Sequence, residues 1–215
     1  MTKPNLVNRF HRFLLFVTLG IAALGIYKVP AEQGLIMHWT AQGQADWVWP
    51  PIVGYSILPV FAAILLLVAA GGSALAPKSR LEMVRHILDP ALTAILALGV
   101  CLQFGLLLIG IGSDFDIIRM VAFAVAALLV LLGILLREAE RHTYAGLRLP
   151  WVMTDDRVWR RTHRLAGWSY VIAGTVLAAL AWLQPYPGTL IVAMPLVLAL
   201  PVLLARMTVI GTRTA

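Results

Sequence analysis

The chain has 215 residues, of which 60% are hydrophobic and only 13% are charged, whereas soluble domains carry about 25% charged residues. Together with a mean hydropathy of +0.87, this composition excludes an ordinary water-soluble fold and indicates membrane insertion. The formal net charge of +7 suits either nucleic-acid binding or basic loops beside anionic lipid. The single cysteine, Cys101, excludes an internal disulfide and a cysteine-based metal cluster.

Uncharged runs predict six membrane-spanning helices. A span needs about 20 apolar residues, because about 30 Å of hydrocarbon is crossed at about 1.5 Å per residue. The last run is about twice as long as one span requires and contains Gln-Pro-Tyr-Pro-Gly at 184–188, a turn sequence, so it predicts two helices. The first run is short and follows basic residues, so a cleaved signal peptide is the alternative there. In chain order the runs are 13–27, 52–76, 90–113, 120–136 and 165–205.

The positions of lysine and arginine predict the orientation. The N-terminal segment, the connections after the second and fourth helices and the C-terminal tail hold 15 of the 17 basic residues, and the opposite sides hold only Lys28 and Arg119. Basic residues mark the cytoplasmic side of a membrane protein. We therefore expect a multi-pass protein of the cytoplasmic membrane with both termini inside, whose basic side faces anionic lipid and not nucleic acid.

These patterns predict the fold class of an all-α integral membrane protein, a bundle of six transmembrane helices with N-in and C-in topology. The length suits one compact bundle. Two of its connections should be structured, an outer loop at 29–51 and a cytoplasmic loop at 138–164.

The outer loop predicts a compact surface at the membrane boundary. Its apolar run 35–39 indicates a strand or an interfacial segment, and residues 41–44 indicate a turn in which Gly43 supplies a positive φ. Three tryptophans suit the interface. Three titratable groups, Glu32, His38 and Asp46, could approach one another. The loop is then an interfacial plug, a recognition surface, a metal site or a hydrolytic site, and the spacing matches no known ligand pattern.

The sequence of the inner loop predicts a connection with a defined structure between the fourth and fifth helices. The fourth helix should continue to about residue 142 and end at Gly146, and Thr154 followed by two aspartates should start a helix that runs into the fifth span. On that helix Trp159 and His163 share a face. The loop is either a basic amphipathic connector on anionic lipid or a docking surface for a cytosolic protein. The docking surface would comprise Arg148, Trp151, Trp159 and His163.

The two loops together resemble the SdpI family of bacterial membrane proteins. The family's inner signature runs Gly-x-Arg-Thr-Pro-Trp-Thr and then x-Trp-x-x-x-His/Asn-Arg, and its outer core runs Ile-Pro-x-His-Trp/Phe-Asn-x-x-Gly-x-x-Asp. This chain departs from them at Ile36, Thr40 and Leu149. The inner matches are Gly146, Arg148, Pro150, Trp151, Trp159, His163 and Arg164, with Gly167 after them, and the outer matches are His38, Trp39, Gly43 and Asp46.

The resemblance divides the chain into an N-terminal two-helix membrane unit over residues 1–87 and an SdpI-like four-helix membrane unit over residues 88–215. It implies a non-enzymatic immunity or sensor protein without a catalytic site, cofactor or metal. Its outer loop would meet a secreted antimicrobial peptide toxin or another envelope signal, and its inner loop would meet a cytosolic transcriptional repressor. A small-molecule or peptide transporter is one alternative, although its helix interiors offer few ionisable groups. A membrane-embedded hydrolase is another, although His38 lies on the side opposite His86, His142 and His163.

Overall fold

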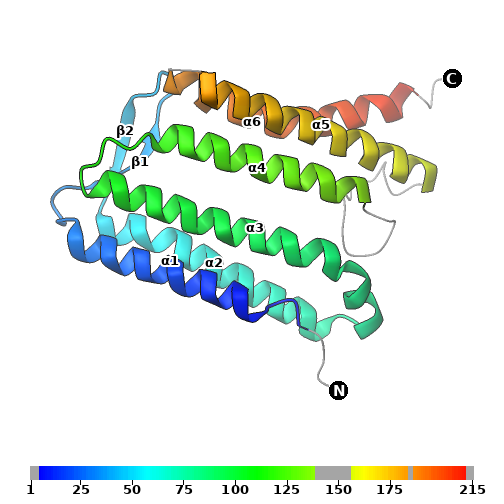
Figure 1. The fold of residues 1–215 in the computed structure, drawn as a ribbon, viewed down its shortest axis with the longest axis horizontal. Helices are drawn as coiled ribbons and strands as arrows, with labels where there is room; N and C mark the ends of the chain where they lie inside the picture. The colour runs from blue at the N-terminus through cyan, green and yellow to red at the C-terminus, as the bar shows by residue number, and fades with distance from the viewer. Residues whose placement is uncertain (1–4, 139–155, 184–185, 212–215) are drawn as a thin grey trace. The chain divides into compact units, whose positions relative to one another are not determined.

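The computed structural model describes residues 5–138, 156–183 and 186–211, and in these ranges it contains six helices and one β-hairpin (Figure 1). Five helices, α1 to α5, are long and apolar enough to cross a membrane, and α6 contains a shorter apolar stretch, Pro187–Ala199. The chain is therefore a multi-pass, predominantly helical membrane protein. The elements are α1 (Arg9–Lys28), β1 (Leu35–Trp39), β2 (Ala45–Trp49), α2 (Pro51–Leu75), α3 (Lys78–Gly110), α4 (Ile117–Glu138), α5 (Asp156–Leu183) and α6 (Pro187–Gly211).

Helix α3 begins earlier than its apolar run predicts. The sequence places the third span at 90–113 and treats the basic residues before it as a loop, but α3 spans 33 residues from Lys78, and only Ala76 and Pro77 separate it from α2. Leu81, Val84 and Ile87 are buried at helical spacing. This buried stripe lets the helix continue beyond its uncharged segment.

The fold divides into two compact units. The first unit comprises residues 1–121 with 186–191, and the second comprises residues 122–185 with 192–215. The division expected near residue 87 follows the family's organisation and stays a prediction.

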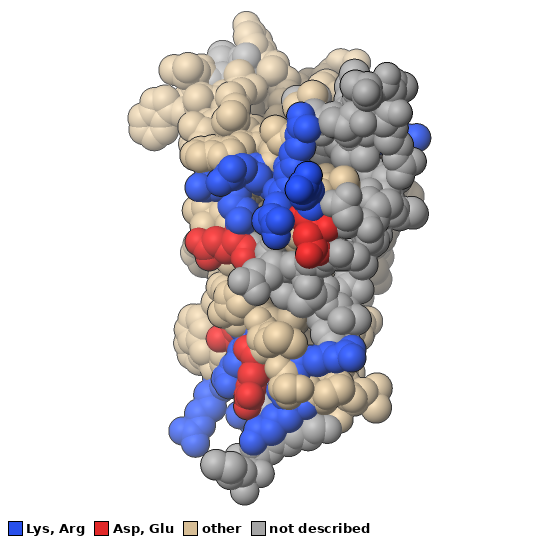
Figure 2. Space-filling model, turned by 90° about the vertical axis from the view of Figure 1, so that its right-hand side faces the viewer, with Lys and Arg blue, Asp and Glu red and all other residues tan. Residues whose placement is uncertain are grey.

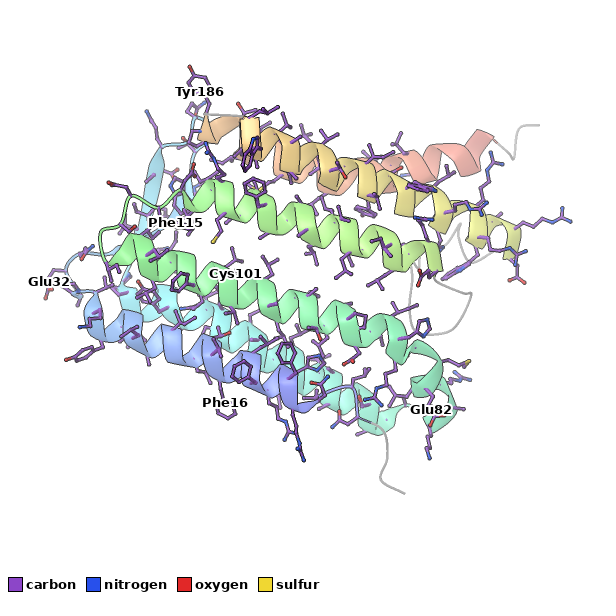
Figure 3. All side chains as sticks on the ribbon, in the orientation of Figure 1. Phe16, Glu32, Glu82, Cys101, Phe115 and Tyr186 are labelled. Atoms are coloured by element: carbon purple, nitrogen blue, oxygen red, sulfur yellow. The ribbon has the colours of Figure 1, made fainter. Side chains whose placement is uncertain are left out.

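Within the first unit, α1, α2 and α3 pack around an apolar core. Many apolar side chains on the same helices point outward, among them Phe16, which projects away from α1 with 70% of its surface exposed (Figure 3). An apolar exterior of this kind is what lipid, rather than water, would solvate. The core members are Leu14, Ala62, Leu66, Leu92 and Leu96.

Within the second unit, α4 and α5 cross at close range in antiparallel directions. A β-carbon on Gly133 would lie 2.6 Å from the Gly167 carbonyl oxygen, and one on Gly174 would lie 2.7 Å from the Ala126 carbonyl oxygen. Such distances exclude any side chain at these positions without a shift of the backbone. Small residues at a crossing are the usual way in which membrane helices approach, because lipid gives no hydrophobic force between them.

Candidate functional site

The outer loop folds into a two-stranded antiparallel hairpin. Strands β1 and β2 pair with Leu35 opposite Trp49 and Ile36 opposite Val48, and the register shifts around His38. In the turn, the Gly43 N–H donates to the Thr40 carbonyl at 2.8 Å, and Gly43 has a φ of +81°. Of the two alternatives that the sequence leaves open at 35–39, the structure contains the strand, and the predicted turn is confirmed.

Contacts at both ends hold the hairpin on the first unit. Near its base, Leu35 is 1% exposed, and a β-carbon on Gly54 of α2 would lie 2.7 Å from its side chain. At its tip, the Gly43 backbone lies so close to Pro187 that an added β-carbon would be 2.9 Å from the proline ring. The packing at both ends therefore fixes the position of the hairpin, and the side chains between them are exposed or partly exposed.

The centre of the hairpin carries a histidine–carboxylate pair. Nδ1 of His38 lies 2.7 Å from Oδ1 of Asp46, and both side chains are exposed, at 58% and 43%. Because the carboxylate can only accept, Nδ1 carries the hydrogen and donates it. The His38 ring stands edge-on to Trp47 at a centroid distance of 6.4 Å, and Trp47 stands edge-on to Trp49 at 5.9 Å.

The hairpin presents the His38–Asp46 pair beside exposed aromatic and apolar side chains. Among the described residues, Glu32 forms no hydrogen bond or ion pair with His38 or Asp46, and no group of three or more His, Cys, Asp and Glu side chains is placed to hold a metal ion. Trp47 is 60% exposed and Val48 54%. Exposed aromatic and apolar groups beside an oriented ion pair form a typical protein-binding surface.

Of the other predicted outer residues, Trp39 is partly buried at the end of β1, where it pairs with Ala45, and Gly43 lies at the turn. On the inner side, Gly146, Arg148, Pro150 and Trp151 lie outside the described residues.

Trp159 and His163 are stacked but buried. Their ring centroids are 3.9 Å apart, and Nδ1 of His163 donates to the Trp159 carbonyl at 3.0 Å. Trp159 is fully buried, and His163 is 1% exposed. They share a face, as the helical spacing predicts, but that face packs inside the second unit. Arg164 is exposed, and Gly167 packs against Gly133.

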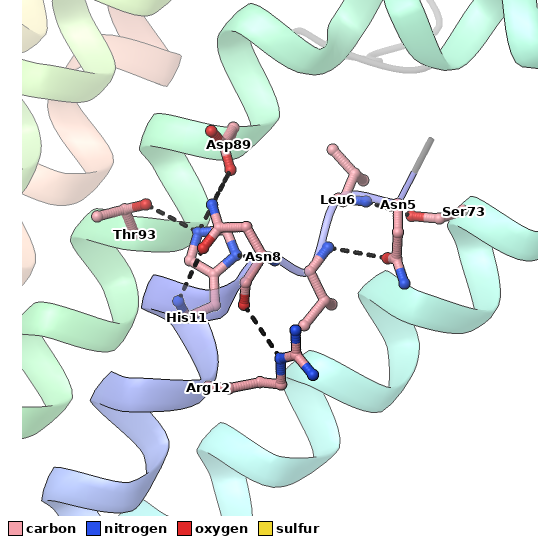
Figure 4. A network of polar contacts seen from close by, with 9 residues as sticks. Asn5, Leu6, Asn8, His11, Arg12, Ser73, Asp89 and Thr93 are labelled. Atoms are coloured by element: carbon pink, nitrogen blue, oxygen red, sulfur yellow. Dashed lines mark hydrogen bonds and ion pairs between the residues drawn. The ribbon is translucent and has the colours of Figure 1, made fainter. Parts of the chain in front are cut away.

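Sequence reasoning missed a polar network at the start of α1 (Figure 4). Nε2 of His11 lies 2.8 Å from the Thr93 hydroxyl and 3.4 Å from Oδ1 of Asp89, and the imidazole is fully buried. Asn8 caps α1 by accepting from the His11 N–H at 3.0 Å and donates from Nδ2 to Asp89 at 2.9 Å. The available signal was Asn8 itself, because asparagine is a common N-cap residue and this one lies shortly before the first apolar run.

A second missed group lies at the other end of the first unit. Tyr55 is fully buried, and its hydroxyl donates to the Leu106 carbonyl at 3.1 Å. Gln103, also fully buried, donates from Nε2 to the Tyr55 carbonyl at 3.2 Å. Gly110 packs against the Tyr55 ring and accepts a hydrogen bond from Gln33 at 2.9 Å. These contacts join α2 to α3 next to Gly54, the residue of α2 against which Leu35 of the hairpin packs.

Comparisons with known proteins point to the same family as the resemblance. Residues 138–212 match the model of the SdpI/YfhL protein family. The chain is 27% identical over 198 residues to a protein of Bacillus subtilis (strain 168) named immunity protein SdpI, and the alignment covers 92% of this chain and 89% of that protein. No solved structure matches the chain. The predicted resemblance to the SdpI family is confirmed.

Proposed function

Because this membrane protein resembles the SdpI family across nearly its whole length, we propose that it is an immunity protein that protects its cell from a secreted peptide toxin. The observation that carries the proposal is the alignment with an immunity protein over 92% of the chain, which is too long to reflect the shared apolar character of one or two helices. The hairpin supplies a surface on which such a toxin could be recognised.

The proposed topology has six spans with both termini in the cytoplasm. In the first unit, Glu32 near the hairpin and Glu82 on α3 mark opposite ends (Figure 3). The end with Glu82 also carries Lys78 and Arg85, whereas the hairpin itself contains no lysine or arginine. By the positive-inside rule, the hairpin then lies on the outer side, where a secreted peptide arrives.

Recognition on this surface would use the His38–Asp46 pair and the neighbouring tryptophans. Around them, the outer segments of the first unit carry four acidic groups against two basic ones, Lys28 and Arg119, and Arg119 is already paired with Asp116 at 3.3 Å. The excess negative charge favours a peptide with basic groups near its contact segment. The acidic groups are Glu32, Asp46, Asp114 and Asp116.

We further propose that the cytoplasmic loop reports toxin binding to a cytosolic transcriptional repressor. The support is the family signature in this loop and the continuity of α5, which runs from Asp156 through the membrane span to Leu183. Since Trp159 and His163 are buried, their part would be to fix the start of α5. Contact with the partner would fall to Arg148 and Trp151.

The direct test is expression in a bacterium that is sensitive to the Sdp toxin because it lacks its own immunity gene. Cells that carry this protein should survive toxin doses that kill cells with an empty vector. Immunoblots of membrane fractions must show that the protein is present. Full sensitivity at normal membrane levels, with purified toxin as well as with producing cells, would reject the immunity function.

A further inference from the structure

The second unit exposes a group of arginines where α4 ends and α5 begins. Arg137 occupies the last turn of α4, and Arg160, Arg161 and Arg164 occupy the early turns of α5. All four side chains are exposed. Figure 2 shows lysine and arginine side chains in separate groups on the surface that it presents.

These arginines have no acidic partners among the residues that the structure describes. No hydrogen bond or ion pair joins Arg160, Arg161 or Arg164 to a carboxylate there, and the contact made by Arg137 is with an aromatic ring, since its Cζ lies 4.0 Å from the centroid of Trp168. Like charges held together on one surface repel one another. An anion bound among them would relieve that repulsion.

Helix packing brings two of these arginines, Arg137 and Arg164, and Trp168 to the crossing of α4 and α5. Gly133 and Gly167 meet at the crossing of α4 and α5. Arg137 lies one helical turn beyond Gly133, and Arg164 lies about one turn before Gly167, so both lie on the same side of the crossing. Trp168 follows Arg164 by four residues and therefore shares its face.

Arg137 and Arg164 also lie where the uncharged segments of α4 and α5 end. Residues 120–136 of α4 and 165–183 of α5 carry no charge, and Arg137 and Arg164 are the first charged residues beyond them. Trp168 is 47% exposed, and a half-exposed indole at the end of an apolar span is typical of the headgroup region. A ligand at this position would meet both lipid chains and water, as a phospholipid does.

We propose that Arg137, Arg161, Arg164 and Trp168 form a binding site for the headgroup of an anionic phospholipid. The guanidinium groups match phosphate oxygens in bidentate geometry, and the ring of Trp168 holds the Arg137 guanidinium in place. Arg161 lies on the same helical face as Trp168, seven residues earlier. Basic pockets between membrane helices bind anionic headgroups by this chemistry. The site is independent of the proposed immunity function.

Purified protein in neutral detergent tests the proposal by titration with phosphatidylglycerol and, separately, with phosphatidylcholine, with bound lipid counted by native mass spectrometry. The wild-type protein should prefer phosphatidylglycerol. Each arginine near a membrane surface contributes about fivefold in affinity for anionic lipid, so Arg137→Gln with Arg164→Gln should lower the preference about 25-fold.

Two matched variants distinguish specific binding by these arginines from attraction by the overall positive charge of the protein. Lys78→Gln with Arg85→Gln removes the same charge from exposed residues of the first unit and should leave the preference unchanged. Arg137→Lys with Arg164→Lys keeps the charge but removes the planar guanidinium, and should lose part of the preference. Elution volume and melting temperature confirm that each variant is folded.

Three results would overturn the proposal. If the Arg137→Gln, Arg164→Gln protein still prefers phosphatidylglycerol to the same degree, these arginines do not bind the lipid. An acidic protein would then be the better candidate ligand for them. An equal loss in the Lys78→Gln, Arg85→Gln control would show that overall charge alone attracts the lipid. Full competition by millimolar glycerol 3-phosphate would show that the site binds soluble phosphates instead of phospholipid.

Discussion

Nε2 of His11 in α1 lies 2.8 Å from the hydroxyl of Thr93 in α3, although 82 positions separate the two residues in the chain. The other ring nitrogen, Nδ1, accepts from the Asn8 N–H at 3.3 Å, so Nε2 carries the hydrogen that is donated to Thr93. One buried imidazole thus caps α1 and joins it to α3.

We predict that His11→Ala destabilises the protein. The substitution leaves the Asn8 N–H without its acceptor and the partly buried Thr93 hydroxyl without its donor, and each lost hydrogen bond costs about 0.5–1.5 kcal/mol. Thermal unfolding in detergent measures the loss. His86→Ala is the matched control, because His86 is an exposed histidine on α3. Equal melting temperatures for the two variants would show that the network contributes nothing.

Gly110→Ala should also destabilise the first unit, because the new methyl group would overlap the Tyr55 hydroxyl. Overpacking of this kind costs about 1–3 kcal/mol. Tyr55→Phe alone should cost about 1 kcal/mol through loss of the hydrogen bond to Leu106. Since phenylalanine removes the overlapping oxygen, the double variant should be more stable than the sum of the two single changes predicts. Additive losses, measured by unfolding in a double-mutant cycle, would contradict this packing.

The His38–Asp46 pair should contribute to protection from the toxin but little to the stability of the fold. Asp46→Asn removes the charge from an exposed ion pair, whose contribution to folding is about 0–1 kcal/mol. If the surface recognises the toxin, the dose that the cells survive should fall about fivefold or more, the effect of losing an interaction of about 1 kcal/mol. Glu32→Gln removes the same charge from an exposed residue outside the pair, so it should lower the survived dose less than Asp46→Asn does. Unchanged protection in Asp46→Asn cells would remove the pair from the recognition surface.

Single cysteines test the topology in a Cys101→Ala background. Cysteines at Gln44, in the hairpin turn, and at Tyr186, which is 71% exposed, should react with a membrane-impermeant thiol reagent in intact cells. A cysteine at Ser79, near the start of α3, should react only after the cells are opened. Reaction at Ser79 in intact cells, or the reverse pattern, is incompatible with the N-in arrangement.

Trp159→Ala and Arg148→Ala should behave differently. Trp159 is fully buried, so its truncation should cost about 3–5 kcal/mol and reduce the amount of protein in the membrane. If Arg148 contacts the repressor, Arg148→Ala protein should reach normal levels and protect cells from toxin while failing to retain the repressor at the membrane. Normal retention by Arg148→Ala would place the docking surface elsewhere.

The sequence by itself determined those features that depend on residues close together in the chain. Charges delimit apolar runs because each charged side chain carries its own cost of entering hydrocarbon, so the apolar part of each helix can be located from the sequence. The turn at Gly43 follows from local backbone chemistry. The proximity of His38 and Asp46 could be expected for the same reason, since only a short hairpin separates them.

Tertiary structure decided the contacts between distant residues and the direction in which helical faces point. The His11–Thr93 and Tyr55–Leu106 hydrogen bonds depend on how α1 and α2 pack on α3, and no local pattern encodes that rotation. The burial of Trp159 is the clearest case. Helical spacing correctly placed it on one face with His163, but an amphipathic aromatic residue suits a protein interior and an interface equally well. Only the packing of the second unit decides between them.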